Sequence, residues 1–342
     1  RFDFAATGPA GASVLNQGEI RTSFGGRAWL LGEQVRNEGL VAAPGGEIVL
    51  AAGRSVEIID SGTPNVVVKV RAPEGKAVNL GSLVANGGRV DVHAGIVNQD
   101  GIVQADSIGV DANGEIVLQA SGELSLGAAS ETRATGGRVQ LAATTLDSRG
   151  KVRAKAVRAA ATELRQQGSI EAPGGRIALS AQALAAVAGV VDASDPAGAG
   201  GTVEITGDSV RLAGATVDAS GGTQGGTVHL GGGWQGSGAL RHARELMVDA
   251  DSVVRANGSA GQGGEIVLWS TTRTDHQGLL EARSGGRIEV SSKGVMSLGG
   301  AIDPGPGGEV LFDPKNLIIE WMDGGGISVG VGMMTLYLAG TE

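Results

Sequence analysis

The sequence predicts an all-β fold, a right-handed single-stranded parallel β-helix (β-solenoid) of roughly 15 rungs. Three observations predict it: a recurring Gly-Gly pair, a short strand pattern after each pair, and an unusual composition. Of 342 residues, 61 are Gly, and only 4 Phe, 1 Tyr and 4 Trp accompany a hydrophobic share of 41%. This chain is too apolar for a disordered polymer and too poor in rings for an ordinary globular core. Its glycines lack the strict period of collagen.

The Gly-Gly pairs mark an internal repeat. Each pair is followed by a polar, an apolar, a variable and an apolar residue. The second glycines, with one from an Asn-Gly variant, are Gly26, Gly46, Gly88, Gly114, Gly137, Gly175, Gly201, Gly226, Gly264, Gly286 and Gly308. If the three longest intervals are double steps, the repeat is about 22 residues, which is typical of one solenoid turn.

The residues after each pair predict a strand. The second and fourth places after the second glycine are apolar in all eleven repeats, and this period of two places one face inward. The pairs are Ala28/Leu30, Ile48/Leu50, Val90/Val92, Ile116/Leu118, Val139/Leu141, Ile177/Leu179, Val203/Ile205, Val228/Leu230, Ile266/Leu268, Ile288/Val290 and Val310/Phe312. A second strand with a Gly turn follows about 10 residues later in many repeats. Two or three strands per rung, stacked in parallel, make a β-helix.

Outward positions indicate contacts between rungs. The residue directly after the glycines alternates in charge, which predicts ion pairs between neighbouring rungs. These residues are Arg27 and Glu47; Arg89, Glu115 and Arg138; Glu265, Arg287 and Glu309. Asn16 and Asn37 share a turn position, and Asn98 is a further candidate for it, so we expect a stacked amide ladder.

Metal, cofactor and nucleotide sites are not expected. The four histidines, at 93, 229, 242 and 276, fall in separate rungs and are expected to be surface polar residues. The chain has no Cys, and its Gly-rich stretches lack the Asp of calcium-binding nonapeptides. Residues 231–236 (GGGWQG) match a dinucleotide-binding pattern but lack the βαβ context that it requires.

Two sets of carboxylates carry the enzymatic alternative, since β-helices also include polysaccharide lyases and hydrolases. The sets are Asp192 with Asp195 and Asp218, and Asp249 with Asp251. Each lies beside a turn, where Asp is favoured for local hydrogen bonds, so we expect no catalytic residue.

Two tryptophans and the net charge bear on ligands. Trp29 and Trp269 occupy outward strand positions and are the candidate residues for stacking on a glycan. The net charge of −9 disfavours nucleic acid and anionic membranes. The longest apolar stretches are too short or too rich in Gly to span a bilayer.

Several segments resemble a known family. They are residues 14–22 (VLNQGEIRT), 25–53, 231–238 (GGGWQGSG), 263–270 (GGEIVLWS), 285–292 (GGRIEVSS) and 311–319 (LFDPKNLII). They resemble filamentous-haemagglutinin-like exoproteins and the high-molecular-weight adhesins among them, which are the passengers of two-partner secretion. In that family Gly-rich rungs lead to a Leu-x-Asp-Pro-x-Asn motif, here Asp313, Pro314 and Asn316, to which we assign a structural role.

The resemblance also implies a division of the chain. The Asn-Pro motifs at the front of the family's secretion domain are absent, so residues 1–110 resemble the back of that domain. Residues 111–320 would form haemagglutinin-type β-helix repeats, and residues 321–342 the start of a following segment. Because the sequence begins with Arg1 rather than Met, we expect a processed product or fragment.

The implied function is that of a secreted adhesin rod on the surface of a Gram-negative bacterium. Such a protein is exported unfolded through an outer-membrane partner transporter. It is not an enzyme, and it attaches to host cells, other bacteria or matrix polysaccharide, as in a biofilm. The expected partners are the transporter, a glycan, an exopolysaccharide or a cell-surface receptor, and further copies stacked end to end. The alternatives are a β-helical polysaccharide lyase or hydrolase and the stalk of a contact-dependent inhibition toxin.

Overall fold

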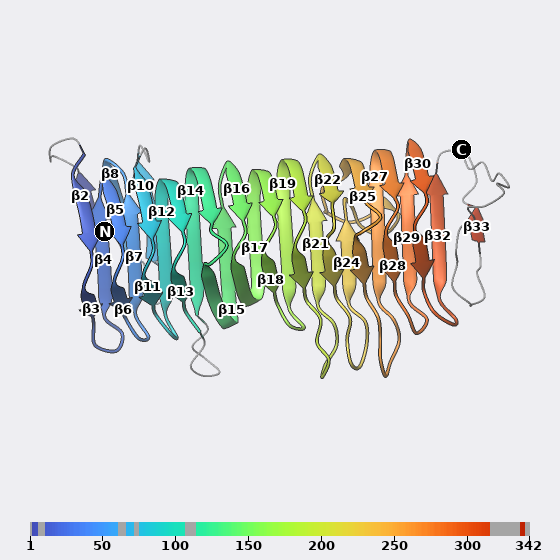
Figure 1. Ribbon diagram of the computed structural model, residues 1–342, viewed down its shortest axis with the longest axis horizontal. Helices are drawn as coiled ribbons and strands as arrows, with labels where there is room; N and C mark the ends of the chain where they lie inside the picture. The colour runs from blue at the N-terminus through green and yellow to red at the C-terminus, as the bar shows by residue number, and fades with distance from the viewer. Residues whose placement is uncertain are drawn as a thin grey trace. The chain divides into compact units, whose positions relative to one another are not determined.

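The computed structural model describes residues 2–5, 11–60, 66–71, 75–106, 114–314 and 336–338. The fold is a parallel β-solenoid of about 12 turns, and in each unit the strands of one turn lie beside those of the next (Figure 1). The chain divides into two compact units, Arg1–Thr162 and Glu163–Glu342, here called the N-terminal and C-terminal units. The family-based boundaries near residues 110 and 320 stay a prediction.

Seventeen strands begin in the N-terminal unit. They are β1 (Phe2–Ala5), β2 (Ser13–Asn16), β3 (Glu19–Arg21), β4 (Arg27–Gly32), β5 (Gln34–Asn37), β6 (Leu40–Ala42), β7 (Glu47–Ala52), β8 (Ser55–Asp60), β9 (Val66–Arg71), β10 (Lys76–Asn79), β11 (Ser82–Val84), β12 (Arg89–Gln99), β13 (Ile102–Gln104), β14 (Glu115–Leu126), β15 (Glu131–Ala142), β16 (Thr145–Ser148) and β17 (Lys151–Gln166).

The C-terminal unit continues the pattern with one short 3-10 helix. Its elements are β18 (Ser169–Glu171), β19 (Arg176–Val187), β20 (Val190–Asp192), β21 (Thr202–Thr206), β22 (Ser209–Leu212), β23 (Thr216–Asp218), β24 (Thr227–Leu230), η1 (Trp234–Gly236), β25 (Ala243–Val248), β26 (Val253–Arg255), β27 (Glu265–His276), β28 (Leu279–Glu281), β29 (Arg287–Ser292), β30 (Val295–Leu298), β31 (Ala301–Asp303), β32 (Glu309–Pro314) and β33 (Leu336–Leu338).

Each turn contributes three parallel strand segments. In the N-terminal unit β2–β5–β10, β3–β6–β11 and β4–β7–β12 are three such columns. In the C-terminal unit the column that follows the Gly-Gly pairs is β19–β21–β24–β27–β29–β32. We call the outer side of this last column the Gly-Gly face.

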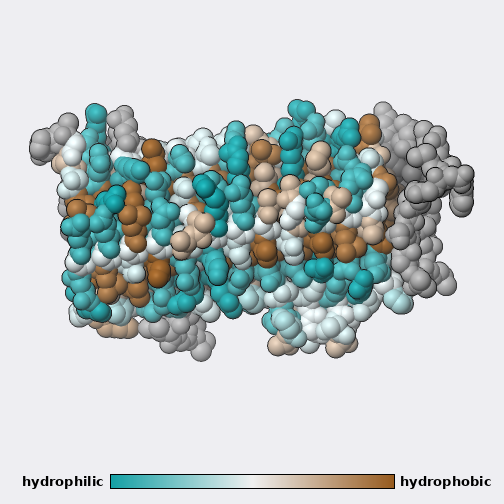
Figure 2. All heavy atoms as spheres, in the orientation of Figure 1, coloured by the Kyte–Doolittle hydropathy of each residue, from teal (hydrophilic) through white to brown (hydrophobic). Residues whose placement is uncertain are grey.

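The core of each unit is the stack of inward aliphatic side chains. All eleven predicted pairs are buried, and the most exposed member, Ala28, retains 7% of its surface. Alternation along each strand leaves the opposite side for polar residues, and the face seen in Figure 2 carries many hydrophilic residues with hydrophobic ones between them. The prediction of inward columns is therefore confirmed.

The expected number of rungs is too high, because two intervals are single turns that carry insertions. Glu47 pairs directly with Arg89, and Thr227 pairs directly with Glu265, so no turn lies between them. The interval from Gly137 to Gly175 does hold an extra turn, the middle of β17, where Arg138 pairs with Ala156. About 12 turns replace the expected 15.

The first insertion supplies β8 and β9, which form a small antiparallel sheet with β1 from the start of the chain, separate from the sheet of the solenoid. β9 lies against β7 and β12. Val49, Ala51 and Val56 form a second apolar cluster, with Trp29 and Leu31 packed against it. The sequence pattern assigns these outward positions of β4 and β7 to solvent, whereas they form a second core.

The amide ladder and the ion pairs between turns are confirmed. Asn16 Nδ2 donates to Asn37 Oδ1, which lies 2.8 Å away, and Asn37 Nδ2 donates to Asn79 Oδ1 at the same distance. Asn79 Nδ2 donates to Gln99 Oε1 at 2.7 Å, so Gln99, not Asn98, is the last member of the ladder. The alternating charges form the pairs Arg27–Glu47, Arg89–Glu115, Arg138–Glu115 and Arg287–Glu265.

Candidate functional site

The carboxylates at 192 and 218 hold turns. Asp192 and Asp218 are register partners on β20 and β23. Asp192 Oδ1 accepts the Ser194 N–H at 2.8 Å, and Asp218 Oδ1 accepts the Ser220 N–H at 2.7 Å. Each carboxylate therefore closes a turn by accepting the N–H two residues later in the chain. This is the local role that the sequence favours for these residues.

Asp195 and Asp249 are engaged in the same way. Asp195 Oδ1 accepts the backbone N–H groups two and three residues ahead, both at 3.0 Å. Asp249 accepts the Gly214 N–H at 3.0 Å and the Ser252 hydroxyl at 2.6 Å. Burial raises the pKa of Asp249, but these hydrogen bonds outweigh it and the pKa is lowered overall. Asp251 is exposed on the same turn. These geometries resemble turn closure rather than an acid–base pair.

Trp269 occupies the predicted outward position of β27, but its ring is buried and is not accessible for stacking on a glycan. Its side chain retains 3% of its surface although it points away from the core. Its ring centroid lies 4.1 Å from that of His242, and Lys293 Nζ is 5.6 Å from the ring. A Cβ at Gly236 would lie 2.7 Å from the indole. The glycine-rich segment therefore closes directly over the ring.

Trp29 is half-buried beneath the insertion of the N-terminal unit. Its Nε1 donates to Glu47 Oε2 at 3.4 Å, and the Arg27 guanidinium lies 5.9 Å from its ring centroid. Part of the indole packs on the apolar cluster of β7 and β8. A glycan contact at Trp29 stays a prediction.

Residues 231–242, here called the 231–242 insertion, close over Trp269 between β24 and β25. The Gln235 N–H donates to Glu289 Oε2 at 2.7 Å, and Gln235 has a left-handed φ of 52°. Burial of Glu289 raises its pKa, and the Ser291 hydroxyl also donates to it at 2.6 Å. The Arg287 guanidinium lies 4.5 Å from the Trp234 ring centroid. The insertion is thus fastened to β29 by a buried carboxylate and a cation–π contact.

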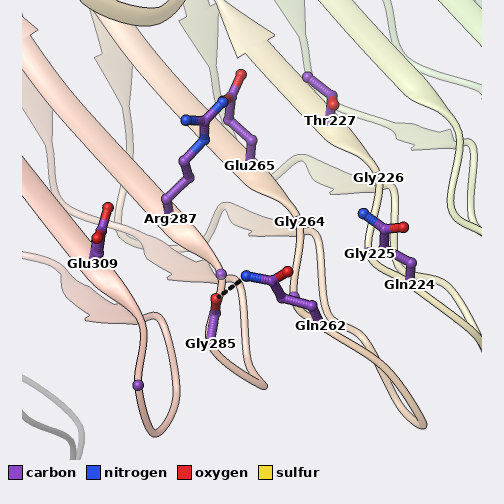
Figure 3. Close-up of a pocket in the computed structure, with 13 residues that line it drawn as sticks. Gln224, Gly225, Gly226, Thr227, Gln262, Gly264, Glu265, Gly285, Arg287 and Glu309 are labelled. Carbon is purple, nitrogen blue, oxygen red and sulfur yellow. Dashed lines mark hydrogen bonds and ion pairs between the residues drawn. The ribbon is translucent and has the colours of Figure 1, made fainter.

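Beside this insertion, a groove of about 510 Å³ crosses four consecutive turns of the Gly-Gly face. It is lined by Gln224, Gly225, Gly226, Thr227, Gln262, Gly263, Gly264, Glu265, Gly285, Gly286, Arg287, Gly307 and Glu309 (Figure 3). We call it the corner groove, because its floor is the Gly-Gly corners. A Cβ at Gly264 would lie 1.9 Å from the Gly226 carbonyl oxygen, so only glycine allows successive turns to stack there.

Polar side chains line the corner groove. Gln262 Nε2 donates to the Gly285 carbonyl at 3.2 Å, which leaves its Oε1 as an acceptor. Within the described part of the chain, the side chains of Gln224 and Thr227 have no hydrogen-bond partner. Figure 3 shows Glu265 and Arg287 pointing toward one another, with Glu309 on the next strand.

Charge in the corner groove is mostly compensated. Glu265 Oε1 lies 2.5 Å from His229 Nε2, and the same carboxylate pairs with Arg287. Burial raises the pKa of Glu265, but the contacts with His229 and Arg287 outweigh it, so the pKa is lowered. Glu309 has no ion-pair partner in the ranges that the structure describes. The groove therefore carries a slight negative charge.

The backbone donors at the strand starts are already used. The Arg287 N–H donates to the Gly264 carbonyl, and the Glu309 N–H donates to the Gly286 carbonyl, both at 2.9 Å. A nest of free N–H groups, as phosphate sites require, is not formed at these positions. At these two positions only side chains, and not backbone N–H groups, are available to contact a ligand.

Two histidines expected at the surface are buried. His276 is fully buried on the inner side of β27, and burial lowers its pKa to about 4. His93 is outward but retains only 8% exposure, near the second apolar cluster. His229 and His242 are half-buried. Within the described ranges no group of three or more His, Cys, Asp or Glu is arranged to hold a metal ion.

The Leu-x-Asp-Pro-x-Asn motif begins in β32, the strand against which β33 pairs in parallel. Asp313 and Pro314 are the last residues of β32, in register with Ser291 and Ser292 of β29. Asn316 lies outside the described residues. No helix in the described segments is long and apolar enough to cross a membrane.

Sequence reasoning missed Trp234 and the two groove glutamines. Gln224 and Gln262 each stand three residues before the first strand residue of their turn, Thr227 and Glu265, and this shared offset was the available signal. Trp234 lies in the interval counted as a double step, and recognising an insertion there would have drawn attention to it.

The fold and the groove define a class: a repetitive β-solenoid whose described surface carries a polar groove formed by successive turns. Among solved structures, the chain is similar to the HMW1 secretion domain from Haemophilus influenzae, at 26% sequence identity. The match covers 92% of this chain and 68% of that one, with a TM-score of 0.35. No family model matches the chain. No curated protein matches it either.

Proposed function

We propose that this chain is part of a secreted, non-catalytic attachment protein of a Gram-negative bacterial surface. It is exported unfolded through an outer-membrane partner transporter and folds outside the cell. There it binds host cells, other bacteria or matrix polysaccharide. The proposal rests on the motif resemblance at residues 14–53 and 231–319, together with the solenoid architecture.

The solenoid suits this route of export. Most of its contacts join one turn to the next, so each turn can fold as it emerges without waiting for a distant segment. The chain has no Cys, so no disulfide loop would obstruct a pore. Export and folding are therefore compatible with a narrow channel.

The observation that carries an attachment role is the corner groove. It is built by four consecutive turns and lined by long polar side chains, which suits an extended ligand rather than a small substrate. The carboxylates that the enzymatic alternative would use for catalysis are engaged in hydrogen bonds of the backbone turns. Asp192, Asp195, Asp218 and Asp249 each accept hydrogen bonds from their own or adjacent turns. We therefore assign them to turn closure and favour binding without chemistry.

An adhesion assay and a depolymerisation assay together test the proposal. Beads coated with the purified chain should bind epithelial cells, bacterial cells or biofilm matrix saturably, whereas beads coated with an unrelated protein of similar negative charge should not. The chain incubated with neutral and acidic polysaccharides should release no new reducing ends. New reducing ends would establish the lyase or hydrolase alternative. If the coated beads bind none of the three surfaces, attachment is refuted.

A further inference from the structure

We infer that the corner groove is the ligand site of this protein and that its ligand is an uncharged, hydroxyl-rich oligosaccharide lying across the four turns. This inference rests on the proposed attachment function and deepens it, because it names the face that binds and the chemical class bound.

The side chains of the groove match a ligand whose groups both donate and accept hydrogen bonds. Gln224 offers a carbonyl oxygen and an amide, Thr227 offers a hydroxyl, and Gln262 retains its Oε1. Glutamine and threonine both donate and accept, as sugar hydroxyls and acetamido groups do. Gln224 and Gln262 hold equivalent positions on adjacent turns, so they repeat at about the 4.8 Å spacing of paired strands.

The charge of the groove favours an uncharged sugar. Arg287 is paired with Glu265 and stacked on Trp234, so its charge is largely compensated and attracts a carboxylate or sulfate only weakly. Glu309 adds a negative charge on the last of the four turns that line the groove, and the chain as a whole has a net charge of −9. An acidic polysaccharide would approach against this field.

A peptide and a nucleic acid suit the groove less well. Extended peptides bind by adding a strand to a free sheet edge, whereas Arg287 and Glu309 donate their N–H groups within the solenoid. Nucleic acids require cations for their phosphates, and here the carboxylates outnumber the available cations. The four turns span about 14 Å along the solenoid, which is the length of a short oligosaccharide.

The test compares variants of the full chain on defined probes. The probes are the hexasaccharides of β-1,4-N-acetylglucosamine, β-1,3-glucose and α-1,4-glucose, with hyaluronan and polygalacturonate oligosaccharides as acidic counterparts. Binding is measured by calorimetry for the wild type and for the double variant Gln224→Ala/Gln262→Ala. The matched control is Gln167→Ala, which removes an exposed glutamine at a different corner of the same unit.

We expect at least one neutral hexasaccharide to bind, and the double variant to weaken it about tenfold, because two polar contacts are lost. Gln167→Ala should bind as the wild type does. Circular dichroism of each variant checks that it is folded. Since Arg287 lies over Trp234, the ligand should also change tryptophan fluorescence, and Trp234→Phe should abolish that change.

Each contrary result has a distinct meaning. Equal binding by the double variant and the wild type would remove the corner groove as the site. Tighter binding of the acidic probes would overturn the neutral class. If no probe binds while coated beads still attach to cells, the glycan inference fails and the attachment function stands. If the beads also fail to attach, the proposed function fails.

Discussion

His276 gives the C-terminal unit a sensitivity to acid that can be calculated. Its imidazole is fully buried in the inner column of β27, between its register partners Val248 and Leu298. Neither ring nitrogen makes a well-directed hydrogen bond within the described residues. Burial is the main cause of its low pKa of about 4, against an ordinary value of 6.5, and the Ala301 backbone and the nearby Asp275 carboxylate oppose the shift only in part.

The sign of the effect follows from proton binding. Between pH 6.5 and about 4 the unfolded chain binds a proton at His276 and the folded chain does not. The free energy of unfolding therefore falls as the pH is lowered through this window. Because one pKa unit corresponds to about 1.4 kcal/mol, the full loss is about 3 kcal/mol. The stability contributed by the neutral ring is fully present above pH 6.5.

The variant His276→Leu tests this reasoning, since its neighbours in the column are aliphatic. Urea denaturation of wild type and variant is followed by circular dichroism at several values between pH 7.5 and 4. We expect similar stability at pH 7.5 and an advantage for the variant that grows to about 3 kcal/mol near pH 4. The control Leu298→Met alters the same column, keeps His276, and should retain the wild-type pH dependence. Parallel loss of stability in wild type and His276→Leu would refute the argument.

Three further predictions concern the solenoid and the 231–242 insertion. Asn79→Ala should lower the free energy of unfolding by about 2 kcal/mol in urea, because two ladder hydrogen bonds lose a partner, whereas the outward Asn98→Ala should change it by less than about 0.5 kcal/mol. Gly46→Ala should lower Tm strongly, because its Cβ would lie 1.9 Å from a carbonyl oxygen on the neighbouring turn. The control Gly18→Ala should melt near the wild type, because no atom lies within 4 Å of the Cβ it adds. Equal Tm values for the two variants would contradict the steric argument. Burial raises the pKa of Glu289 above 4.5, so the folded chain holds that proton longer and stability falls as the pH rises through this range. Glu289→Gln should remove that fall in denaturation curves between pH 4.5 and 7, and an unchanged pH profile would count against it.

The inner columns were predictable from local sequence because strand periodicity and glycine corners are properties of short segments. Ile48 and Leu50 point inward for the same reason as Val139 and Leu141: alternation along a strand leaves no other choice once one face is apolar. Part of the ladder, Asn16 and Asn37, was predicted for the same reason, whereas Asn79 was missed and Asn98 was named in place of Gln99, a shift of a single residue. Such a shift moves a side chain to the opposite face.

The environment of the outward residues was not predictable from these patterns. Trp269 and His93 occupy outward positions, yet both are buried, because covering depends on which distant segment folds back over the face. The same limitation produced the error in turn number. An interval of 38 residues has the same length whether it holds a turn, as at β17, or an insertion, as at residues 231–242.

The sequence by itself determined the repeat, the direction of the aliphatic columns and the charge pairs between turns, because each follows from spacing within one turn and from the stacking of equivalent positions on successive turns. Only the tertiary structure decided what covers the outer surface and where a groove opens. Gln224, Gln262 and Arg287 lie far apart in the chain and line one groove because successive turns place equivalent corners about 4.8 Å apart.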